Sequence, residues 1–459
     1  MQKYRYNDGP FLIMSSNSET SAVICWTTAK EKDSILYWGT TGIKNSQLDK
    51  MITSPKATFH TATIKNLFPE TTYFYSIDEN FSLYPEKNIF SFTTFSAKNS
   101  NKEIEFIIAG DFQPKNKYTL KTNRIMAEQI NREKPDFIVQ TGDMVQIGSS
   151  KKTWHNFMKS LPIMSSERPF LPAIGNHEYY IFHKNKNFRS FFPYPFKSKK
   201  GCYYSKDTGS VHVVFLDPYD GGFAGMNSKI GKAQKIWLIS DLDNALKRNM
   251  KWFFIVLHQP PLTCGEYPVD IKLRNWLIPI ASRYKIDAVF FGHAHLYEHW
   301  SYTYGANGFL LNPKDTPGDS PVEYFCIGSS GASLESNYHL FSHRPYRFNN
   351  SKWFNTKTEQ TEKINEMQNP WNKNIFFKRE SISNRFEQLD LHFYQNPDLS
   401  YTSNKNWFGY KYGENTLHYA KVKIEKNICT ISIHYPDGSL LQGPEGTIPQ
   451  SFVLNKKNR

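Results

Sequence analysis

Five short motifs of this 459-residue chain carry side chains that can bind metal ions or transfer protons. They are Gly110-Asp111-Phe112-Gln113, Gly142-Asp143-Met144, Gly175-Asn176-His177-Glu178, Val256-Leu257-His258 and Gly292-His293-Ala294-His295. Carboxylates, an amide oxygen and imidazoles together suit divalent Mn, Fe or Zn. Asp143 could bridge two ions, because a carboxylate has lone pairs for both. Two ions about 3.5–4 Å apart can generate hydroxide from water and clamp a phosphate, so the motifs indicate chemistry on a phosphate ester.

Each motif alone has an ordinary structural explanation. A Gly-Asp pair is usually only a turn, and one histidine after a strand more often makes a hydrogen bond within the fold. The Gly-His-Xaa-His motif is more selective, because it places two imidazoles at one turn. All five motifs occur in order, each after a run of strand-forming residues, which argues strongly against coincidence.

The motifs need a sheet that brings them together. From about residue 104, apolar runs alternate with amphipathic segments of helical length, which predicts an α/β domain. Strands are expected at 105–109, 136–140, 170–174, 211–216, 252–257 and 287–291, and helices at 120–132, 153–160, 232–248 and 271–283. Ligands gather at the carboxyl ends of the strands in such sheets, so the five motifs should converge.

The residues before 104 follow a different pattern. Short alternating runs at 21–28, 34–39, 61–64, 72–77 and 89–94 are separated by turn residues, which predicts an all-β sandwich. We therefore expect a β-sandwich over residues 1–97, a polar linker at 98–103 and a catalytic α/β domain over 104–459.

Within the catalytic domain, the stretch at about 335–414 has little periodicity and is rich in Asn, Lys and aromatic residues. We interpret it as an insertion or a lid. Strands at 418–424 and 428–435 are then expected to return to the catalytic sheet.

Composition favours a well-packed protein, with 39% hydrophobic residues and a net charge of +14. The positive charge attracts anionic substrates, but its basic residues are interspersed and form no recognised nucleic-acid-binding pattern. We expect a small phosphorylated substrate and neither nucleic acid nor a membrane as partner, and the oligomeric state stays unknown. The polar start shows no signal peptide, no apolar run reaches membrane-spanning length, and the five scattered cysteines decide no compartment.

The series of motifs resembles the calcineurin-like metallophosphoesterases, and within them the purple acid phosphatases. The hairpin at 203–217, the segment Gln234-Lys235-Ile236-Trp237-Leu238 and a leading sandwich similar to fibronectin type III domains also resemble that branch. The resemblance covers most of the chain outside 335–414. It implies an acid phosphatase-like phosphomonoesterase with a metal-bound hydroxide at a dinuclear centre, in a secreted or periplasmic location.

The resemblance also implies a role for each site residue. One ion would be bound by Asp111, Asp143 and His295, and the other by Asp143, Asn176, His258 and His293. His177 would be the catalytic residue beside the phosphate, assisting the leaving group or stabilising the transition state. Glu178 would orient His177 or a ligand. We interpret His183 and His299 as structural rather than pocket-lining.

One coordination position departs from the family pattern. Purple acid phosphatases carry a ligating tyrosine three residues after the bridging aspartate, where this chain has Gln146. Many other metallophosphoesterases supply a histidine two residues after the first aspartate, where this chain has Gln113. Gln113 is therefore a candidate ligand through its amide oxygen, or a holder of a ligand water. A neutral donor stabilises ferric iron less than a phenolate, so we expect two divalent ions and no purple colour.

Three alternatives stay open. A phosphodiesterase of the same superfamily would need room for a second substituent, in a pocket shaped by 179–196 and 335–414. A metal-binding scaffold or adhesion protein with vestigial activity should have lost several ligands, whereas all but one of the usual positions are filled here. A nuclease or nucleic-acid binder fits the charge but lacks a recognised binding module.

Overall fold

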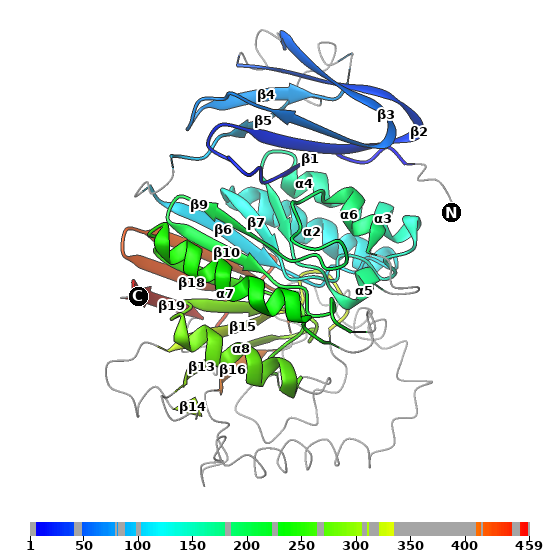
Figure 1. Ribbon diagram of the computed structural model, residues 1–459. Helices are drawn as coiled ribbons and strands as arrows, with labels where there is room; N and C mark the ends of the chain where they lie inside the picture. Colours follow the sequence, from blue (N-terminus) through cyan, green and yellow to red (C-terminus); the bar gives the residue numbers. More distant parts are fainter. Residues whose placement is uncertain are drawn as a thin grey trace.

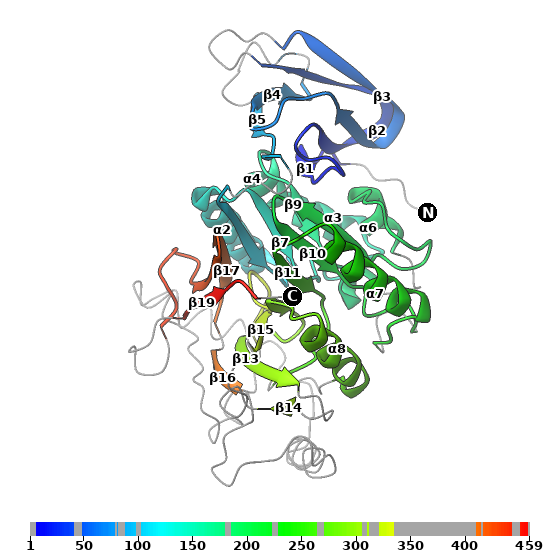
Figure 2. The ribbon, with the colours of Figure 1, turned by 60° about the vertical axis from the view of Figure 1, so that its left-hand side comes forward.

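A computed structural model describes residues 6–40, 48–78, 80, 88–97, 102–179, 185–222, 228–263, 270–304, 310–311, 321–334, 410–414, 416–442 and 450–457. These residues form an N-terminal antiparallel β domain above two mixed sheets with flanking helices (Figures 1 and 2). The predicted fold class, an all-β domain followed by an α/β domain, is confirmed. In these ranges, no helix has both the length and the apolar character of a membrane span.

The N-terminal sheet has the order β1-β2-β4-β5, with β3 on β2. Its strands are β1 (Phe11–Ile13), β2 (Ala22–Gly39), β3 (Lys50–Ile64), β4 (Thr72–Ser76) and β5 (Phe90–Thr93). The prediction of separate strands at 21–28 and 34–39 was wrong, because β2 is continuous through both. The exposed residues 30–33 do not end the strand, because pairing with β3 resumes beyond them after register shifts. For the same reason β3 begins at Lys50, well before the predicted position 61.

The first sheet of the catalytic domain has the order β19-β18-β17-β6-β7-β8. Its strands are β6 (Ile104–Ala109), β7 (Phe137–Gln140), β8 (Phe170–Pro172), β17 (Tyr419–Glu425), β18 (Ile428–His434) and β19 (Ser451–Asn455). Strands β6, β7 and β8 are parallel, and β17 pairs antiparallel with β6. The C-terminal strands therefore return to the catalytic sheet, as predicted.

The second catalytic sheet has the order β14-β13-β15-β12-β11-β10-β9, with β16 on β13. Its strands are β9 (Tyr204–Thr208), β10 (Val211–Phe215), β11 (Trp252–Val256), β12 (Ala288–Phe291), β13 (Tyr297–Tyr304), β14 (Leu310–Leu311), β15 (Val322–Ile327) and β16 (Tyr410–Glu414). The last five residues of the predicted insertion thus form a strand of this sheet. Residues 335–409 lie outside the described part of the chain.

Helices cover both outer sides of the sheet pair, with α2 on one side and α7 on the other (Figure 2). They are α2 (Lys117–Glu133), α3 (Lys151–Met158), α4 (Leu161–Ser165), α5 (Asn176–Tyr179), α6 (Lys186–Phe191), α7 (Lys232–Lys247) and α8 (Ile271–Arg283). Helix α2 begins before the predicted position 120, because Asn116 and Thr119 form a reciprocal capping box.

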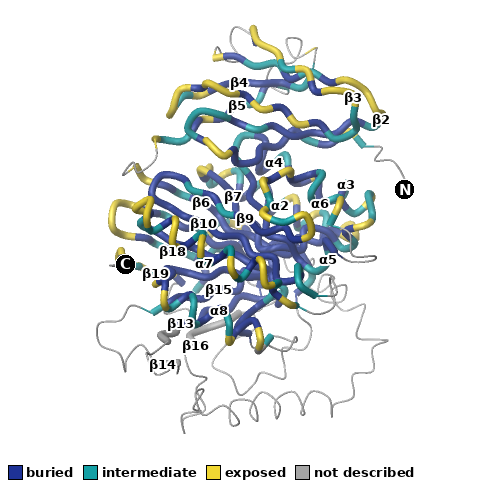
Figure 3. Tube along the Cα trace, viewed as in Figure 1, coloured by how far each residue is buried: buried dark blue, intermediate teal, exposed yellow. Residues whose placement is uncertain are grey.

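One buried core joins the two catalytic sheets and extends into the N-terminal domain (Figure 3). Phe106 of β6 meets Phe254 of β11 edge to face, with ring centroids 5.6 Å apart. From the N-terminal domain, Phe11 packs on Phe192 at 5.7 Å, and the Tyr75 hydroxyl donates to the carbonyl of Ser166 at 2.5 Å. The N-terminal domain is therefore fixed on the catalytic domain.

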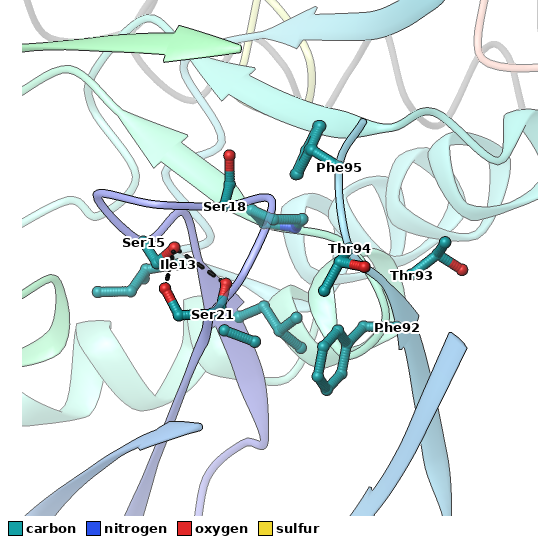
Figure 4. Close-up of a pocket in the computed structure, with 11 residues that line it drawn as sticks. Ile13, Ser15, Ser18, Ser21, Phe92, Thr93, Thr94 and Phe95 are labelled. Atoms are coloured by element: carbon teal, nitrogen blue, oxygen red, sulfur yellow. Dashed lines mark hydrogen bonds between the residues drawn. The ribbon is translucent and has the colours of Figure 1, made fainter. Parts of the chain in front are cut away.

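A small cavity lies near this junction (Figure 4). Ser15, Ser18 and Ser21 line it together with residues 92–95. Its volume of about 10 Å³ is about the space for one water molecule. None of the predicted site residues lines it, so it is not the candidate site.

Candidate metal centre

The five motif turns meet where strands of the two catalytic sheets end. They follow β6, β7 and β8 of the six-stranded sheet and β11 and β12 of the eight-stranded sheet. Main-chain hydrogen bonds join the turns, from Asp111 N to Gly142 O (3.1 Å) and from Gly292 N to His258 O (3.1 Å). The site is thus assembled from turns at the carboxyl ends of strands in both sheets.

Tight turns hold the site residues in an uncommon backbone conformation. Asp111, Gln113, Asp143 and His293 all have positive φ, at 52°, 34°, 56° and 70°. This conformation is unfavourable for residues other than glycine, so the surrounding contacts must maintain it. Gly142 also has positive φ, and a Cβ there would lie 2.6 Å from the His258 ring. The main chain at Gly142 therefore lies so close to the His258 ring that only glycine fits there.

Four ligand-type atoms converge at the centre of the site. His258 Nε2 lies 2.9 Å from Asn176 Oδ1 and 3.2 Å from Asp143 Oδ2. His293 Nδ1 lies 3.2 Å from Asn176 Oδ1 and 3.3 Å from His258 Nε2. Asp143, His258 and His293 can each offer a ligand atom within 4.8 Å of the others.

Main-chain carbonyls fix the orientation of three site imidazoles. The Nδ1 contacts are His177 with Gln146 O (2.7 Å), His258 with Thr141 O (3.0 Å) and His295 with Ser333 O (2.6 Å). A carbonyl can only accept, so Nδ1 carries the hydrogen and the opposite nitrogen, Nε2, is left for a ligand. His293 is the exception, because its Nδ1 faces the site.

This donor set fits a cation. Burial and the charge of His258 lower the pKa of His293 to about 3, which keeps that ring neutral. Burial alone would lower the pKa of His258, but the charges of Asp143 and Asp111 outweigh it and raise the pKa. A proton on His258 Nε2 can therefore bond Asn176 Oδ1 or Asp143 Oδ2, and a cation would take the place of that proton. A metal ion would bind all of these atoms at once.

The two aspartates of the site respond differently to their surroundings. Burial raises the pKa of Asp111 well above its usual value, and the Asp143 charge adds to the rise. For Asp143, burial acts in the same direction, but His258 and His177 outweigh it and lower the pKa. Two carboxylates buried this closely are costly unless cations compensate their charge.

The position expected for the other ion lies beside Asp111. His295 Nε2 is 3.5 Å from Asp111 Oδ1, and the main-chain N–H of His293 donates to both oxygens of Asp111, at 3.1 and 3.2 Å. The side chains of His295 and His177 are each 22% exposed, whereas that of His258 is fully buried. Solvent therefore reaches the site on the side of His177 and His295.

Gln113 contacts the candidate bridging residue through its amide nitrogen. Its Nε2 donates to Asp143 Oδ2 at 2.9 Å, and the side chain is buried. Its role as a direct ligand stays a prediction. Gln146, at the position of the family tyrosine, contributes its main-chain carbonyl to His177.

Glu178 fixes the turn that carries Asp143. Its carboxylate accepts from the main-chain N–H groups of Gly175 (2.8 Å), Asp143 (2.9 Å), Met144 (2.9 Å) and Val145 (3.2 Å). Burial and the Asp143 charge raise the pKa of Glu178 to about 8, and the backbone donors act in the opposite direction. Glu178 thus orients a candidate ligand, as expected.

A sixth loop at the site was missed by the sequence analysis. After β15, Ser330 Oγ accepts from Gly110 N at 3.0 Å and donates to His418 O at 2.8 Å. Two residues further on, the main-chain N–H of Ala332 donates to Asp111 O at 2.8 Å. The available signal was a buried run followed by Gly328, as in the other motifs.

Of the other two histidines singled out from the sequence, His299 is described and is not part of this cluster. His299 lies buried on β13, stacks on Phe325 at 4.6 Å and bonds to Glu323 at 2.6 Å. That environment is structural, in line with our interpretation. His183 lies outside the described residues.

Comparison with known proteins identifies the class. Residues 104–297 match the calcineurin-like phosphoesterase family, and residues 9–94 match the purple acid phosphatase N-terminal domain. The chain therefore contains a calcineurin-like phosphoesterase domain preceded by a purple acid phosphatase N-terminal domain, which confirms the resemblance seen in its motifs.

Individual relatives are distant. Purple acid phosphatase 21 of Arabidopsis thaliana is 29% identical over 282 residues, which are 59% of this chain and 58% of that protein. An uncharacterized protein of Mycobacterium tuberculosis, Rv2577, is 26% identical over 318 residues, 61% of this chain and 59% of its own length. The chain thus spans less than two thirds of these relatives.

Solved structures share the fold. The purple acid phosphatase PPD1 of yellow lupin (Lupinus luteus) superposes with a TM-score of 0.63 at 13% identity, covering 97% of this chain and 74% of that one. PhoD superposes with a TM-score of 0.56 at 11% identity, covering 99% and 90%. At such identities, the likeness is one of fold alone.

Proposed function

We propose that this protein is a metal-dependent hydrolase of phosphomonoesters. The proposed ligands of two divalent ions are Asp111, Asp143, Asn176, His258, His293 and His295, with Gln113 beside them. The observation that carries the proposal is the convergence of His258 Nε2, His293 Nδ1 and Asn176 Oδ1 within 3.3 Å of one another. A divalent ion in place of the proton on His258 would bind all three atoms at once.

Two bound divalent ions would supply the positive charge that polarises a phosphoryl group and lowers the pKa of water. Asp143 would be held for the bridging role, because its Oδ1 accepts from the main-chain N–H of His177 at 2.9 Å and its Oδ2 lies 3.2 Å from His258 Nε2. The Nδ1 contacts of His258 and His295 leave Nε2 of each ring as the atom that would bind an ion.

His177 is placed to act on the substrate. Its Nε2 lies 3.9 Å from Asp143 Oδ2 and its ring is partly exposed, whereas Nδ1 is bound by the carbonyl of Gln146. In its protonated form, Nε2–H can donate to the leaving-group oxygen or to a developing negative charge on the phosphoryl oxygens. We propose it as the catalytic residue that is not a ligand.

We propose divalent rather than ferric ions, because the described site offers no phenolate. The nearby hydroxyl of Tyr219 donates instead to Gln259 Oε1 at 3.1 Å. The preference for monoesters is supported by the similarity to proteins named purple acid phosphatases. A phosphodiesterase with the same metal centre is the nearest alternative.

The test is hydrolysis of a chromogenic phosphomonoester and its matching diester by metal-stripped protein. Mn, Fe(II), Zn, Ni or Mg is added back singly, with Asp143→Asn as the inactive variant and Asp437→Asn, on an exposed turn, as the matched control. We expect metal-dependent monoester turnover that only Asp143→Asn abolishes. A higher rate on the diester would favour the phosphodiesterase. Bound metal without turnover of either ester would favour the scaffold.

A further inference from the structure

Asp217 is a buried carboxylate outside the proposed ligand set. It lies just after β10 and has no exposed surface. Its Oδ2 accepts from the Tyr179 hydroxyl at 2.5 Å and from the N–H of Cys202 at 2.7 Å, and its Oδ1 accepts from the N–H of Tyr219 at 3.0 Å. Burial raises its pKa to about 6, so the carboxylate is mainly ionised at neutral pH. Three donors compensate its burial.

Through Tyr179, this carboxylate is connected to the turn that carries two site residues. Tyr179 is buried and ends α5, the four-residue helix that contains Asn176 and His177. One helical turn has almost no hydrogen-bond ladder of its own. Its orientation therefore depends on contacts such as the one between the Tyr179 hydroxyl and Asp217.

Through Tyr219, the same carboxylate is connected to the His258 turn. The Tyr219 hydroxyl donates to Oε1 of Gln259, the residue after His258, at 3.1 Å. The rings of Tyr219 and His258 lie 6.4 Å apart, and the rings of Tyr219 and Tyr179 meet edge to face at 6.1 Å. Tyr219 thus lies next to His258 and also contacts Tyr179, which connects Asp217 to the Asn176 turn.

The two connected turns belong to different sheets. Asn176 follows β8 of the six-stranded sheet, and His258 follows β11 of the eight-stranded sheet. Their ligand atoms nevertheless lie only 2.9 Å apart. Metal affinity depends on keeping such distances between ligand atoms constant. Removing a residue that hydrogen-bonds to a ligand and orients it typically weakens metal binding by about 10–100-fold.

We infer that Asp217 is a positioning residue that fixes the Asn176 turn relative to the His258 turn, and thereby sets the affinity for the metal ion these two residues bind. The inference rests on the proposed function, because it takes both residues as ligands. It assigns Asp217 no contact with substrate or metal. Its influence passes through Tyr179 and Tyr219.

The experiment titrates metal-stripped full-length protein with MnCl₂ in a calorimeter. Tyr179→Phe and Tyr219→Phe each remove one hydroxyl and keep the ring, and Asp217→Asn removes the charge. Tyr75→Phe is the matched control, since it deletes an equally buried hydroxyl at the domain junction. We expect the tyrosine variants at the site to weaken one of two Mn²⁺ affinities by roughly 10–100-fold, with metal-free Tm falling no more than in the control.

Each outcome decides the inference. The inference is overturned if Tyr179→Phe and Tyr219→Phe both bind Mn²⁺ as tightly as the wild type while their Tm falls as in the control. Asp217 would then be purely structural, and this conclusion would hold even if Asp217→Asn did not fold. Failure of the wild-type protein to bind any metal would overturn the proposed function and the inference together. Normal metal binding without ester hydrolysis would overturn only the proposed function, because the affinities of the variants would still decide the inference.

Discussion

At the scale of single residues, Gln113 is where this site departs from its family. Its amide donates to Asp143 Oδ2, the oxygen that also faces His258. Hydrogen bonds to charged groups contribute about 1.5–3 kcal/mol. We expect Gln113→Ala to weaken Mn²⁺ binding by roughly tenfold, measured by calorimetric titration of metal-stripped protein. Gln129→Ala, which truncates a buried glutamine of α2, is the control, and unchanged affinity in Gln113→Ala would contradict a role in metal binding.

Glu178 has a larger structural task, because four main-chain N–H groups depend on one carboxylate. Glu178→Ala would leave these buried donors without their acceptor. We expect the free energy of unfolding of the metal-free protein to fall by about 3–5 kcal/mol, from urea denaturation. Glu128→Ala, which removes a surface i,i+4 ion pair with Arg124, should cost about 0.5 kcal/mol or less. Equal losses in the two variants would refute this account of Glu178.

Side-chain types at the site could be predicted, because ligand chemistry restricts them to few residues. The acceptors behind the imidazoles could not, since the main chain of any residue offers a carbonyl. Thr141 and Ser333 orient His258 and His295 through their main-chain carbonyls, so their side chains give no signal in the sequence. The sequence shows only that the Gln146 side chain replaces the family tyrosine, whereas the structure shows that its carbonyl contacts His177.

At the scale of elements, His212 connects a hairpin to a helix. Its Nδ1 lies 2.6 Å from Asp207 of β9, and its Nε2 lies 3.2 Å from Asp241 of α7. Burial alone would lower the pKa of His212, but the two carboxylates outweigh it and raise the pKa. Because its pKa is higher in the folded state, protonated His212 stabilises the fold fully at pH values below its unfolded pKa, near 6.5. This stabilisation is lost as the pH rises through the folded-state pKa.

We therefore expect wild-type protein to lose its stability advantage over His212→Gln as the pH rises from 6 to 9. Urea denaturation at each pH measures the difference. His434→Gln is the matched control, because burial lowers the pKa of His434 and the pH dependence should have the opposite sign. Parallel curves for the wild type and His212→Gln would show that the proton on His212 contributes nothing.

Elements differed in how well their sequence defined them. The strands that precede the motifs were placed within about two residues, because buried runs such as β11 end at clear turns. The continuity of β2 was not predictable, because it depends on pairing with β3 and not on residues 30–33 themselves. β15 gave no comparable signal, because the loop after it contributes the Ser330 hydroxyl and main-chain groups but no metal-ligand side chain.

At the scale of the whole molecule, the two domains share a core. Phe11 is 1% exposed and belongs to the cluster that fills the catalytic domain. We expect Phe11→Ala to lower the free energy of unfolding by about 3–5 kcal/mol, and calorimetry to show one transition for the whole chain in both proteins. Phe68→Ala, at an exposed position of the same domain, is the control. Two separate transitions in the wild type would contradict a shared core.

The order of domains could be predicted because each has its own periodicity. Their contact could not be predicted, since β1 is only a short apolar run and Phe192, the partner of its Phe11, lies far along the chain. Long-range packing of this kind leaves no local pattern in a single sequence.

The left-handed backbone of Asp111, Gln113, Asp143 and His293 has an evolutionary consequence. Each such residue costs the metal-free fold of order 1 kcal/mol or more, so selection for stability alone would favour glycine at these positions. In a lineage that kept the fold but no longer needed the metals, we would expect these four positions to be among the first to change to glycine. Residues other than glycine at all four positions are what continuing selection for the chemistry would produce.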